Sequence, residues 1–209
     1  MAVVLLDRFT ALDAVGPHEM LVRLPGAETV LVAERPGPVR NDAGSLALAA
    51  DRSLAHVPRP DVVVVPGGPG QSAQMDNEAL LDRLRAADAS STWTASVCTG
   101  SLLLAAAGLL RGRRAASHWL ALGHLERYGA EATGERVVTD GKYVTAAGVS
   151  SGTDTGLTLL GRPAGDEHAQ AVQPLTEYDP RPPYDAGPPR EAPAHLVEEF
   201  RKKSRFILT

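Results

Sequence analysis

The chain has 209 residues, 44% of them hydrophobic and 22% charged, which is enough to bury a core in one domain and excludes a disordered chain. Its 21 Lys and Arg residues against 25 Asp and Glu residues give a net charge of −4, so no overall positive field favours nucleic acid as a partner. A single cysteine excludes an intramolecular disulfide and a Cys-rich zinc site.

The amino-terminal segment predicts neither a signal peptide nor a membrane anchor. Acidic Asp7 follows too few apolar residues for a signal-peptide core, and the longest later apolar run, residues 101–110, is shorter than the roughly 18 residues that span a bilayer. We therefore expect a soluble, cytoplasmic protein without membrane partners.

Short β-branched runs alternate with helix-like stretches through most of the chain. The runs predict strands at residues 3–6, 29–32, 61–65 and 94–97, and the stretches between and after them predict helices at 17–24, 79–87, 99–110, 118–128 and 153–160. Residues 62–65 are apolar on both faces, which is typical of a parallel strand between two layers of helices. The alternation predicts an α/β fold: a doubly wound, mostly parallel sheet sandwiched by helices.

The last third of the sequence is less regular. Asp140-Gly141-Lys142 predicts a hairpin turn between strands at 136–139 and 143–146. Residues 161–165 should break the preceding helix, and a further helix should run from 166 towards 178, kinked by Pro174. The proline-rich stretch 179–193 predicts an extended strap before an amphipathic helix at 194–208. We expect one domain over residues 1–189 and a C-terminal extension over 190–209.

The strongest chemical signal is the lone cysteine, Cys98, where a predicted strand ends and a helix begins at once. This strand-turn-helix context is typical of a nucleophile elbow, in which the side chain projects from the carboxyl edge of the sheet. The amino end of the following helix should favour thiolate, which predicts a lowered pKa for Cys98 and fast alkylation. The alternative is an inert cysteine in the core.

Two further motifs follow other predicted strands. After strand 61–65, Pro66-Gly67-Gly68-Pro69-Gly70 frees main-chain amides, so Gly67 and Gly68 are candidates for an oxyanion hole, with a phosphate loop or a plain turn as alternatives. Asp13 is predicted in the loop after the first strand, before Pro17 at a helix start, where it can reach the same crevice or merely stabilise the loop.

None of the six histidines has metal-ligand spacing with another histidine or with a carboxylate pair, so no metal is expected. Only His118, predicted to open a helix after a strand at 114–116, is a candidate for the pocket wall. Its alternative role is purely structural.

Five stretches together resemble the ThiJ/PfpI superfamily, and within it the isonitrile hydratase branch. They occur in family order as far as about residue 189: Leu12-Asp13-Ala14-Val15-Gly16-Pro17-His18-Glu19, Pro66-Gly67-Gly68-Pro69-Gly70, Ser96-Val97-Cys98-Thr99-Gly100-Ser101, Ala116-Ser117-His118-Trp119 and Glu177-Tyr178-Asp179-Pro180. The fold implied is like that of flavodoxin and the class I glutamine amidotransferases.

The resemblance implies a role for each matching residue. Cys98 would be the nucleophile, Asp13 the acid and base, and Thr99 a polar neighbour, with the Gly68 and Thr99 amides as the anion site. The implied activity adds water to an isonitrile to give an N-substituted formamide through a thioimidate on Cys98, in a homodimer that needs no cofactor.

Other branches of the superfamily match less well. PfpI-type proteases have a histidine directly after the cysteine, where this chain has Thr99. The glyoxalase-like and chaperone-like branch uses a glutamate on the first helix to hold the cysteine, a role that Glu19 would take here. The alternatives therefore remain a glyoxalase- or deglycase-like enzyme on small reactive carbonyls, and a non-catalytic cysteine redox sensor.

Overall fold

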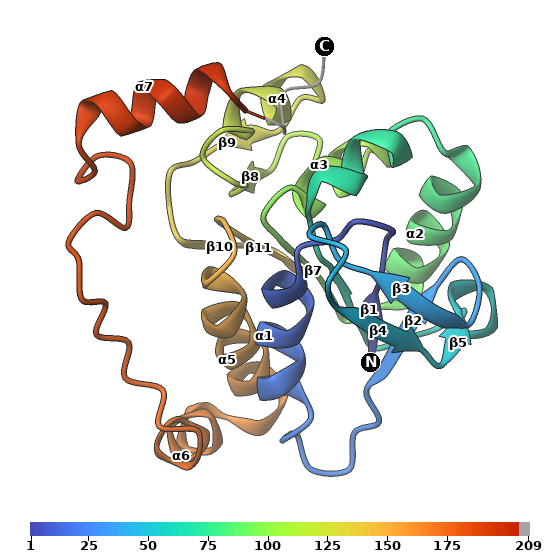
Figure 1. Cartoon of the computed structure of the whole chain (residues 1–209). Helices are drawn as coiled ribbons and strands as arrows, with labels where there is room; N and C mark the ends of the chain where they lie inside the picture. The colour runs from blue at the N-terminus through green and yellow to red at the C-terminus, as the bar shows by residue number, and fades with distance from the viewer. Residues whose placement is uncertain (205–209) are drawn as a thin grey trace.

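The computed structural model describes residues 1–204 of the chain, and its centre is a seven-stranded sheet (Figure 1). Only the pair of strands at one edge, β10 and β11, is antiparallel, and all other neighbours are parallel. This confirms the predicted mostly parallel α/β fold. In spatial order the strands are β10 (Val137–Asp140), β11 (Tyr143–Ala146), β7 (Trp93–Val97), β6 (Val62–Val65), β1 (Ala2–Val4), β2 (Val30–Ala33) and β5 (Arg52–Ser53).

Helices cover both faces of the sheet. On one face α1 (Ala11–Leu21) and α5 (Ser151–Ala164) pack against each other, and Val3 and Val64 belong to the core beneath them. On the other face Val4 and Val63 belong to a core shared with α2 (Glu78–Ser90), α3 (Gly100–Ala106) and α4 (Leu122–Arg127). Because side chains alternate between faces along a strand, burial on both sides explains the unbroken valine run of β6.

Smaller elements lie outside the seven-stranded sheet. A hairpin of β3 (Gly37–Arg40) and β4 (Ala47–Ala50) follows β2, and β8 (Arg114–Ala115) pairs with β9 (Glu131–Ala132). Two 3₁₀ turns, η1 (Leu54–His56) and η2 (Pro69–Gln74), flank β6 in the chain. The β3–β4 hairpin was not predicted, because Gly37-Pro38 and an alanine-rich β4 lack the β-branched residues typical of strands.

The order of the strands fixes where a site can form. The chain runs from β1 outward through β2 to β5, then returns to β6 on the other side of β1 and continues through β7 to β11. The carboxyl ends of β1 and β6 therefore flank a switch point, the place where open α/β sheets bind ligands. The segments that follow β1, β6 and β7 carry Asp13, Gly67 and Cys98.

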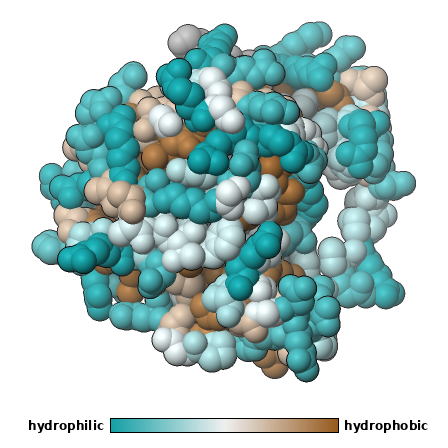
Figure 2. Space-filling model, turned by 180° about the vertical axis from the view of Figure 1, so that it is seen from behind, coloured by the Kyte–Doolittle hydropathy of each residue, from teal (hydrophilic) through white to brown (hydrophobic). Residues whose placement is uncertain are grey.

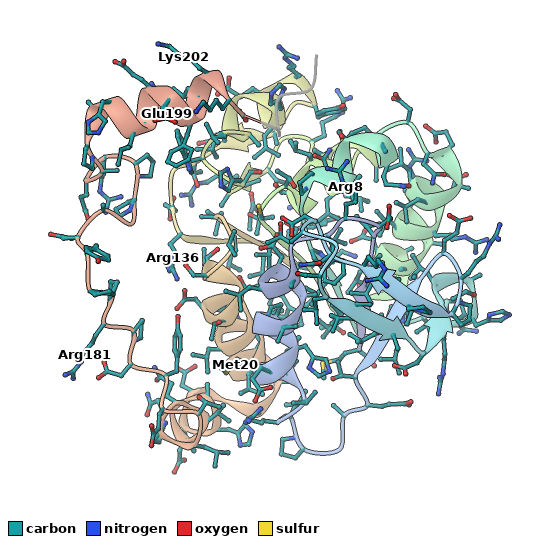
Figure 3. All side chains as sticks on the ribbon, in the orientation of Figure 1. Arg8, Met20, Arg136, Arg181, Glu199 and Lys202 are labelled. Atoms are coloured by element: carbon teal, nitrogen blue, oxygen red, sulfur yellow. The ribbon has the colours of Figure 1, made fainter. Side chains whose placement is uncertain are left out.

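The C-terminal part of the chain stands apart from the sheet. After α6 (Asp166–Leu175) the strap stands off from the body, with an open gap that the space-filling view shows (Figure 2). Arg181 points outward from the strap, and α7 (Ala194–Lys202), with Glu199 and Lys202, crosses the top of the molecule (Figure 3). None of the described residues of α7 is buried. The rest of the helix predicted at 194–208 lies partly outside the described residues, which end at 204.

Two predicted helix boundaries are wrong because of proline. α1 begins at Ala11, so Pro17 lies inside it and Asp13 lies in its first turn rather than in a loop. The close packing of α1 on α5 stabilises a helix that the proline alone would disfavour. α5 likewise continues through Pro163 and ends at Ala164, because the next residue, Gly165, has a positive φ of 85°.

Other boundaries also moved. α3 ends at Ala106 rather than at 110, and the helix predicted from His118 begins only at Leu122. Pro174 lies in the last turn of α6, so it ends that helix instead of kinking it. Across residues 1–204, no helix combines the length and the hydropathy that crossing a membrane requires.

Candidate functional site

Cys98 follows β7 in a backbone conformation that is rare outside glycine. Its φ is 58°, and such a residue persists only where its surroundings hold it. Its amide donates to the carbonyls of Ala146 and Ala147 at 3.2 and 3.1 Å, while its carbonyl accepts from the hydroxyls of Ser101 and Ser117 at 3.1 and 3.0 Å. Since α3 begins just after Cys98, this is the predicted strand-turn-helix elbow. Hydrogen bonds at both its amide and its carbonyl hold the backbone in place.

Asp13 lies beside Cys98 on the first turn of α1 and is fully buried. Its Oδ2 accepts a hydrogen bond from the Gly67 amide at 3.1 Å, whereas its Oδ1 has no hydrogen-bond partner among the described residues. Burial raises the pKa of Asp13 to about 7, against smaller lowering effects from Cys98 and the Gly67 amide. Nearby Asp42 adds a further small increase. The carboxyl group is therefore poised to gain or lose a proton near neutral pH.

The thiol of Cys98 does not have the lowered pKa that the sequence predicted. Burial raises this pKa well above the ordinary value for a cysteine, and the charge of Asp13 raises it further. Backbone amides of Thr99 and Val149 act in the opposite direction, but less strongly. The prediction was wrong because α3 has only seven residues and Cys98 is fully buried, so desolvation outweighs the helix dipole. The resting group at neutral pH is the thiol.

The Gly67 and Gly68 amides of the glycine loop after β6 are not free, because they donate hydrogen bonds to side chains of the site. The Gly67 amide donates to Asp13, and the Gly68 amide donates to the Thr99 hydroxyl at 3.0 Å. A Cβ on Gly67 would lie 2.5 Å from the Thr99 nitrogen, so only glycine fits there. The expected oxyanion hole at Gly67 and Gly68 is thus occupied by side chains of the site itself. Thr99 contributes its amide to the sulfur and its hydroxyl to the loop.

Val149 is the residue of the site that the sequence analysis missed. It follows β11 and has a φ of 43°, a rare value for a β-branched side chain, and its amide helps to stabilise negative charge on Cys98. Nothing in the run Ala147-Gly148-Val149-Ser150 predicts this geometry. The amides of Thr99 and Val149 therefore act on the Cys98 sulfur, whereas the amides of Gly67 and Gly68 donate to Asp13 and Thr99.

His118 and Glu19 also differ from their predicted places. The His118 ring packs against Gly148 and stacks on Trp119, with ring centres 6.0 Å apart. It therefore lies against the residue that precedes Val149. Glu19 is exposed and pairs with Arg23 at 2.7 Å. It therefore does not hold the buried cysteine as a glutamate of the glyoxalase-like branch would.

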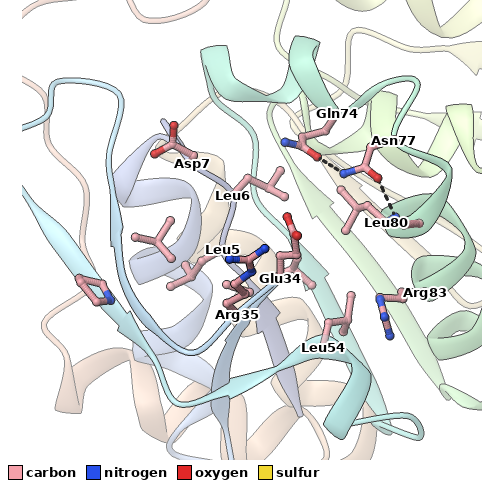
Figure 4. Close-up of a pocket in the computed structure, with 15 residues that line it drawn as sticks. Leu5, Leu6, Asp7, Glu34, Arg35, Leu54, Gln74, Asn77, Leu80 and Arg83 are labelled. Atoms are coloured by element: carbon pink, nitrogen blue, oxygen red, sulfur yellow. Dashed lines mark hydrogen bonds between the residues drawn. The ribbon is translucent and has the colours of Figure 1, made fainter.

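A separate cavity of about 420 Å³ opens at the carboxyl ends of β1 and β2 (Figure 4). Its floor includes Leu6, Leu54 and Leu80, and neither Cys98 nor Asp13 lines it. The cavity and the buried pair are therefore distinct features.

Comparisons with known proteins agree with this geometry. The DJ-1/PfpI family matches residues 1–162 of the chain. An isonitrile hydratase of Pseudomonas putida is 40% identical over 200 residues, which cover 96% of this chain and 87% of the relative. The transcriptional regulator GbdR of Pseudomonas aeruginosa is 30% identical over 84% of this chain, but the match spans only 49% of that regulator.

Solved structures show the same fold. A ThiJ/PfpI family protein from Pseudomonas syringae superposes with a TM-score of 0.94 at 38% identity, covering 97% of this chain and 84% of its own. DJ-1beta of Drosophila melanogaster, at 23% identity, shares the fold with a TM-score of 0.77 over 86% of this chain and 97% of its own. With a buried cysteine elbow after β7 and most of its length matched, the chain belongs to the DJ-1/PfpI family.

Proposed function

We propose that the chain is an isonitrile hydratase, a lyase that adds water to an isonitrile through a covalent intermediate on Cys98. The observation that carries this is the buried pair: a thiol with a raised pKa next to a carboxyl group whose pKa is about 7. The pair holds one proton above pH 7, and that proton can pass between sulfur and oxygen. Similarity to the Pseudomonas putida isonitrile hydratase over most of both chains supports the assignment.

In the first half of the reaction the Asp13 carboxylate takes the thiol proton as the sulfur attacks the terminal carbon of the isonitrile. Asp13 then gives that proton to the same carbon, so the S–H bond is in effect added to it and a thioimidate forms. The free Oδ1 is suited to this transfer, because the Gly67 amide fixes only Oδ2.

In the second half Asp13, again a carboxylate, takes a proton from water as the oxygen attacks the thioimidate carbon. The proton passes to the nitrogen, and the resulting tetrahedral species collapses to the N-substituted formamide. The leaving sulfur accepts the hydroxyl proton through Asp13, which restores the thiol. The Thr99 and Val149 amides stabilise sulfur while it carries negative charge.

The burial of Cys98 favours an isonitrile over the alternative substrates. An isonitrile is linear at its reacting end and presents its carbon at the tip, whereas a carbonyl carbon carries its oxygen and two substituents around it. A fully buried thiol is therefore reached more easily by the tip of an isonitrile than by a carbonyl carbon. The same burial, with a raised thiol pKa, disfavours a redox sensor, since rapidly oxidised cysteines are exposed and acidic.

The test is to mix the purified protein with cyclohexyl isocyanide and, separately, with methylglyoxal, and to measure N-cyclohexylformamide and lactate. The proposal expects formamide and no lactate. Lactate alone would favour the glyoxalase-like alternative. If neither product appears while Cys98 is readily and reversibly oxidised by peroxide, the redox sensor replaces the enzyme.

We also propose that the protein is a homodimer. Leu12 and Val15 on α1 and Val22 at its C-cap are 44%, 37% and 43% accessible, and this spacing puts all three on one side of the helix. A second copy would cover this apolar stripe. Light scattering coupled to size exclusion should give twice the mass of the chain at micromolar concentration, and a strict monomer would contradict the proposal.

A further inference from the structure

The segment before His118 is anchored at two successive residues. The Ala116 amide donates to the Thr145 hydroxyl on β11 at 2.8 Å, and the Ser117 hydroxyl donates to the Cys98 carbonyl at 3.0 Å. Both interactions are buried, so the position from which the His118 side chain projects is fixed relative to the elbow and to β11.

The ring of His118 fills the space beside Gly148. A Cβ on Gly148 would lie 2.5 Å from Cδ2 and 3.2 Å from Nε2 of His118, closer than real Cβ contacts allow. The Leu120 amide donates to His118 Nδ1 at 3.3 Å and sets the orientation of the ring. The ring and the Gly148 backbone are thus in direct contact, with no room for a side chain between them.

The residue after Gly148 is Val149, whose strained backbone needs support from both sides. From α5 the Gly152 amide donates to the Val149 carbonyl at 3.2 Å. From the other side the support is the His118 ring on Gly148. A β-branched residue at positive φ persists only when its neighbours hold it, so removal of either support should let the Val149 amide turn away from the sulfur.

We propose that His118 is a positioning residue: its ring, wedged against Gly148, keeps the Val149 amide directed at the Cys98 sulfur. The role depends on the shape of the ring and not on its ionisation. The expected effect on turnover rests on the proposed hydratase function, whereas the expected effect on the pKa of Cys98 does not. The inference and the proposed function can therefore be tested separately.

The first experiment is a double-mutant cycle of Gly148→Ala, His118→Ala and the two combined. The readouts are the pH dependence of Cys98 alkylation by iodoacetamide, which is specific because the chain has one cysteine, and kcat and KM for cyclohexyl isocyanide. Loss of one amide hydrogen bond to a charged group should raise the apparent pKa of Cys98 by about one unit and lower kcat about tenfold, with KM changed by less than about twofold.

The effect of the combined variant, compared with those of the two single variants, shows whether the His118 ring and Gly148 act through direct contact or independently. Gly148→Ala should be the more harmful single change, because its methyl group collides with the ring. The combined variant should lie closer to wild type than Gly148→Ala alone, since the collision is gone. If the two effects simply multiply, or if Gly148→Ala behaves like wild type, the wedge is refuted.

A second series separates shape from proton transfer. His118→Phe keeps a ring without nitrogen and should retain kcat and the Cys98 pKa within about threefold and half a unit, whereas His118→Asn keeps a polar group without a ring and should resemble His118→Ala. The reverse order would overturn the inference, because it would show that a hydrogen bond of His118 matters and the shape of its ring does not. His195→Ala, at an exposed histidine on α7, is the control and should change neither readout.

Failure of the hydratase proposal would leave a distinct pattern. Wild type would then form no formamide. The pH dependence of Cys98 alkylation in wild type and the three variants would still reveal whether the effects of Gly148→Ala and His118→Ala depend on each other. An absent coupling in those profiles refutes the wedge whatever the substrate is.

Discussion

Two buried aspartates lie at opposite edges of the sheet and show what distinguishes a reactive carboxyl group from a structural one. At the amino ends of β7 and β11, Asp88 Oδ1 accepts from the Thr94 hydroxyl at 2.7 Å and pairs with Lys142 at 3.1 Å, and its Oδ2 accepts from the Tyr143 hydroxyl at 3.2 Å. At the carboxyl edge, Asp13 has only the Gly67 amide and the Cys98 thiol as partners, and its Oδ1 is without a hydrogen bond among the described residues.

The difference lies in how completely each group is satisfied. Hydroxyls and an ammonium around Asp88 tie α2 to β7 and β11, whereas burial without such partners raises the proton affinity of Asp13. In the proposed mechanism the incompletely hydrogen-bonded carboxyl group of Asp13 lowers the stability of the fold and serves as the acid and base. Four predictions test this contrast.

The largest effect is expected at the nucleophile. Cys98→Ala should abolish formamide production, because no other group in the site can form the thioimidate. Cys98 is fully buried, but the cavity that alanine leaves in place of one sulfur atom should cost only about 1 kcal/mol, so the melting temperature should stay within a few degrees. Calorimetry beside the turnover assay checks both, and full activity in this variant would remove Cys98 from the mechanism.

Replacement of the reactive aspartate should lower activity and raise stability. Asp13→Asn removes the acid and base, so turnover should fall by about 10²-fold or more. Because the pKa of Asp13 is raised from 3.8 to about 7 in the folded protein, its ionisation destabilises the fold as pH rises through this window, by on the order of 4 kcal/mol above pH 7.

Unfolding measured in urea should therefore show Asp13→Asn to be more stable than wild type at pH 8 and close to it at pH 4. If Asp13→Asn and wild type were equally stable at pH 4 and at pH 8, ionisation of Asp13 would not destabilise the fold, and its pKa would not be raised. Retention of more than about a tenth of the turnover would make Asp13 a structural residue.

The pH profile should carry the signature of the same group. Below pH 7 both Asp13 and Cys98 hold protons, and no base remains to take the thiol proton. kcat/KM should therefore fall about tenfold per unit below pH 7 and level off above it. The comparison variant Asp88→Asn should keep this limb, and Asp13→Asn should lose it.

The smallest effect on activity is expected at the structural aspartate. Asp88→Asn removes the negative charge that pairs with Lys142, which keeps its hydrogen bond to the Asp88 carbonyl, and weakens the bonds to Thr94 and Tyr143. The change should destabilise the fold by about 2 kcal/mol, a moderate value because Lys142 is partly exposed. Turnover per folded molecule should stay within about twofold of wild type. A larger loss of turnover would mean that the two edges of the sheet are coupled.

Much of the fold was accessible from sequence because the residues of β6 and β7 are unambiguous. The unbroken valine run of β6 before a glycine loop, and the short strand-like run of β7 before the lone cysteine, predicted parallel strands and a site at their carboxyl ends. The start of α1 was not accessible, since Pro17 signals a helix start locally and only packing against α5 allows the helix to begin at Ala11. This error placed Asp13 in a loop, although its partnership with the site was predicted.

The electrostatics of the site were the least predictable part. A helix start beside Cys98 suggested an acidic thiol, but complete burial depends on side chains from distant parts of the chain. Val149 was missed because its residue type does not signal a positive φ, and the residues near its segment, Gly152 and His118, come from other elements of the chain.

The central claim is that Cys98 and Asp13 act together on an isonitrile, and acid-quenched intact mass spectrometry tests it most directly. Wild-type protein mixed with excess cyclohexyl isocyanide at pH 8 should show, within the first turnover, a mass increase equal to one isonitrile molecule on the peptide that contains Cys98. This adduct should decay as N-cyclohexylformamide appears once the isonitrile is consumed. Formamide that accumulates with no adduct on Cys98, and at the same rate in Cys98→Ala, would contradict the account.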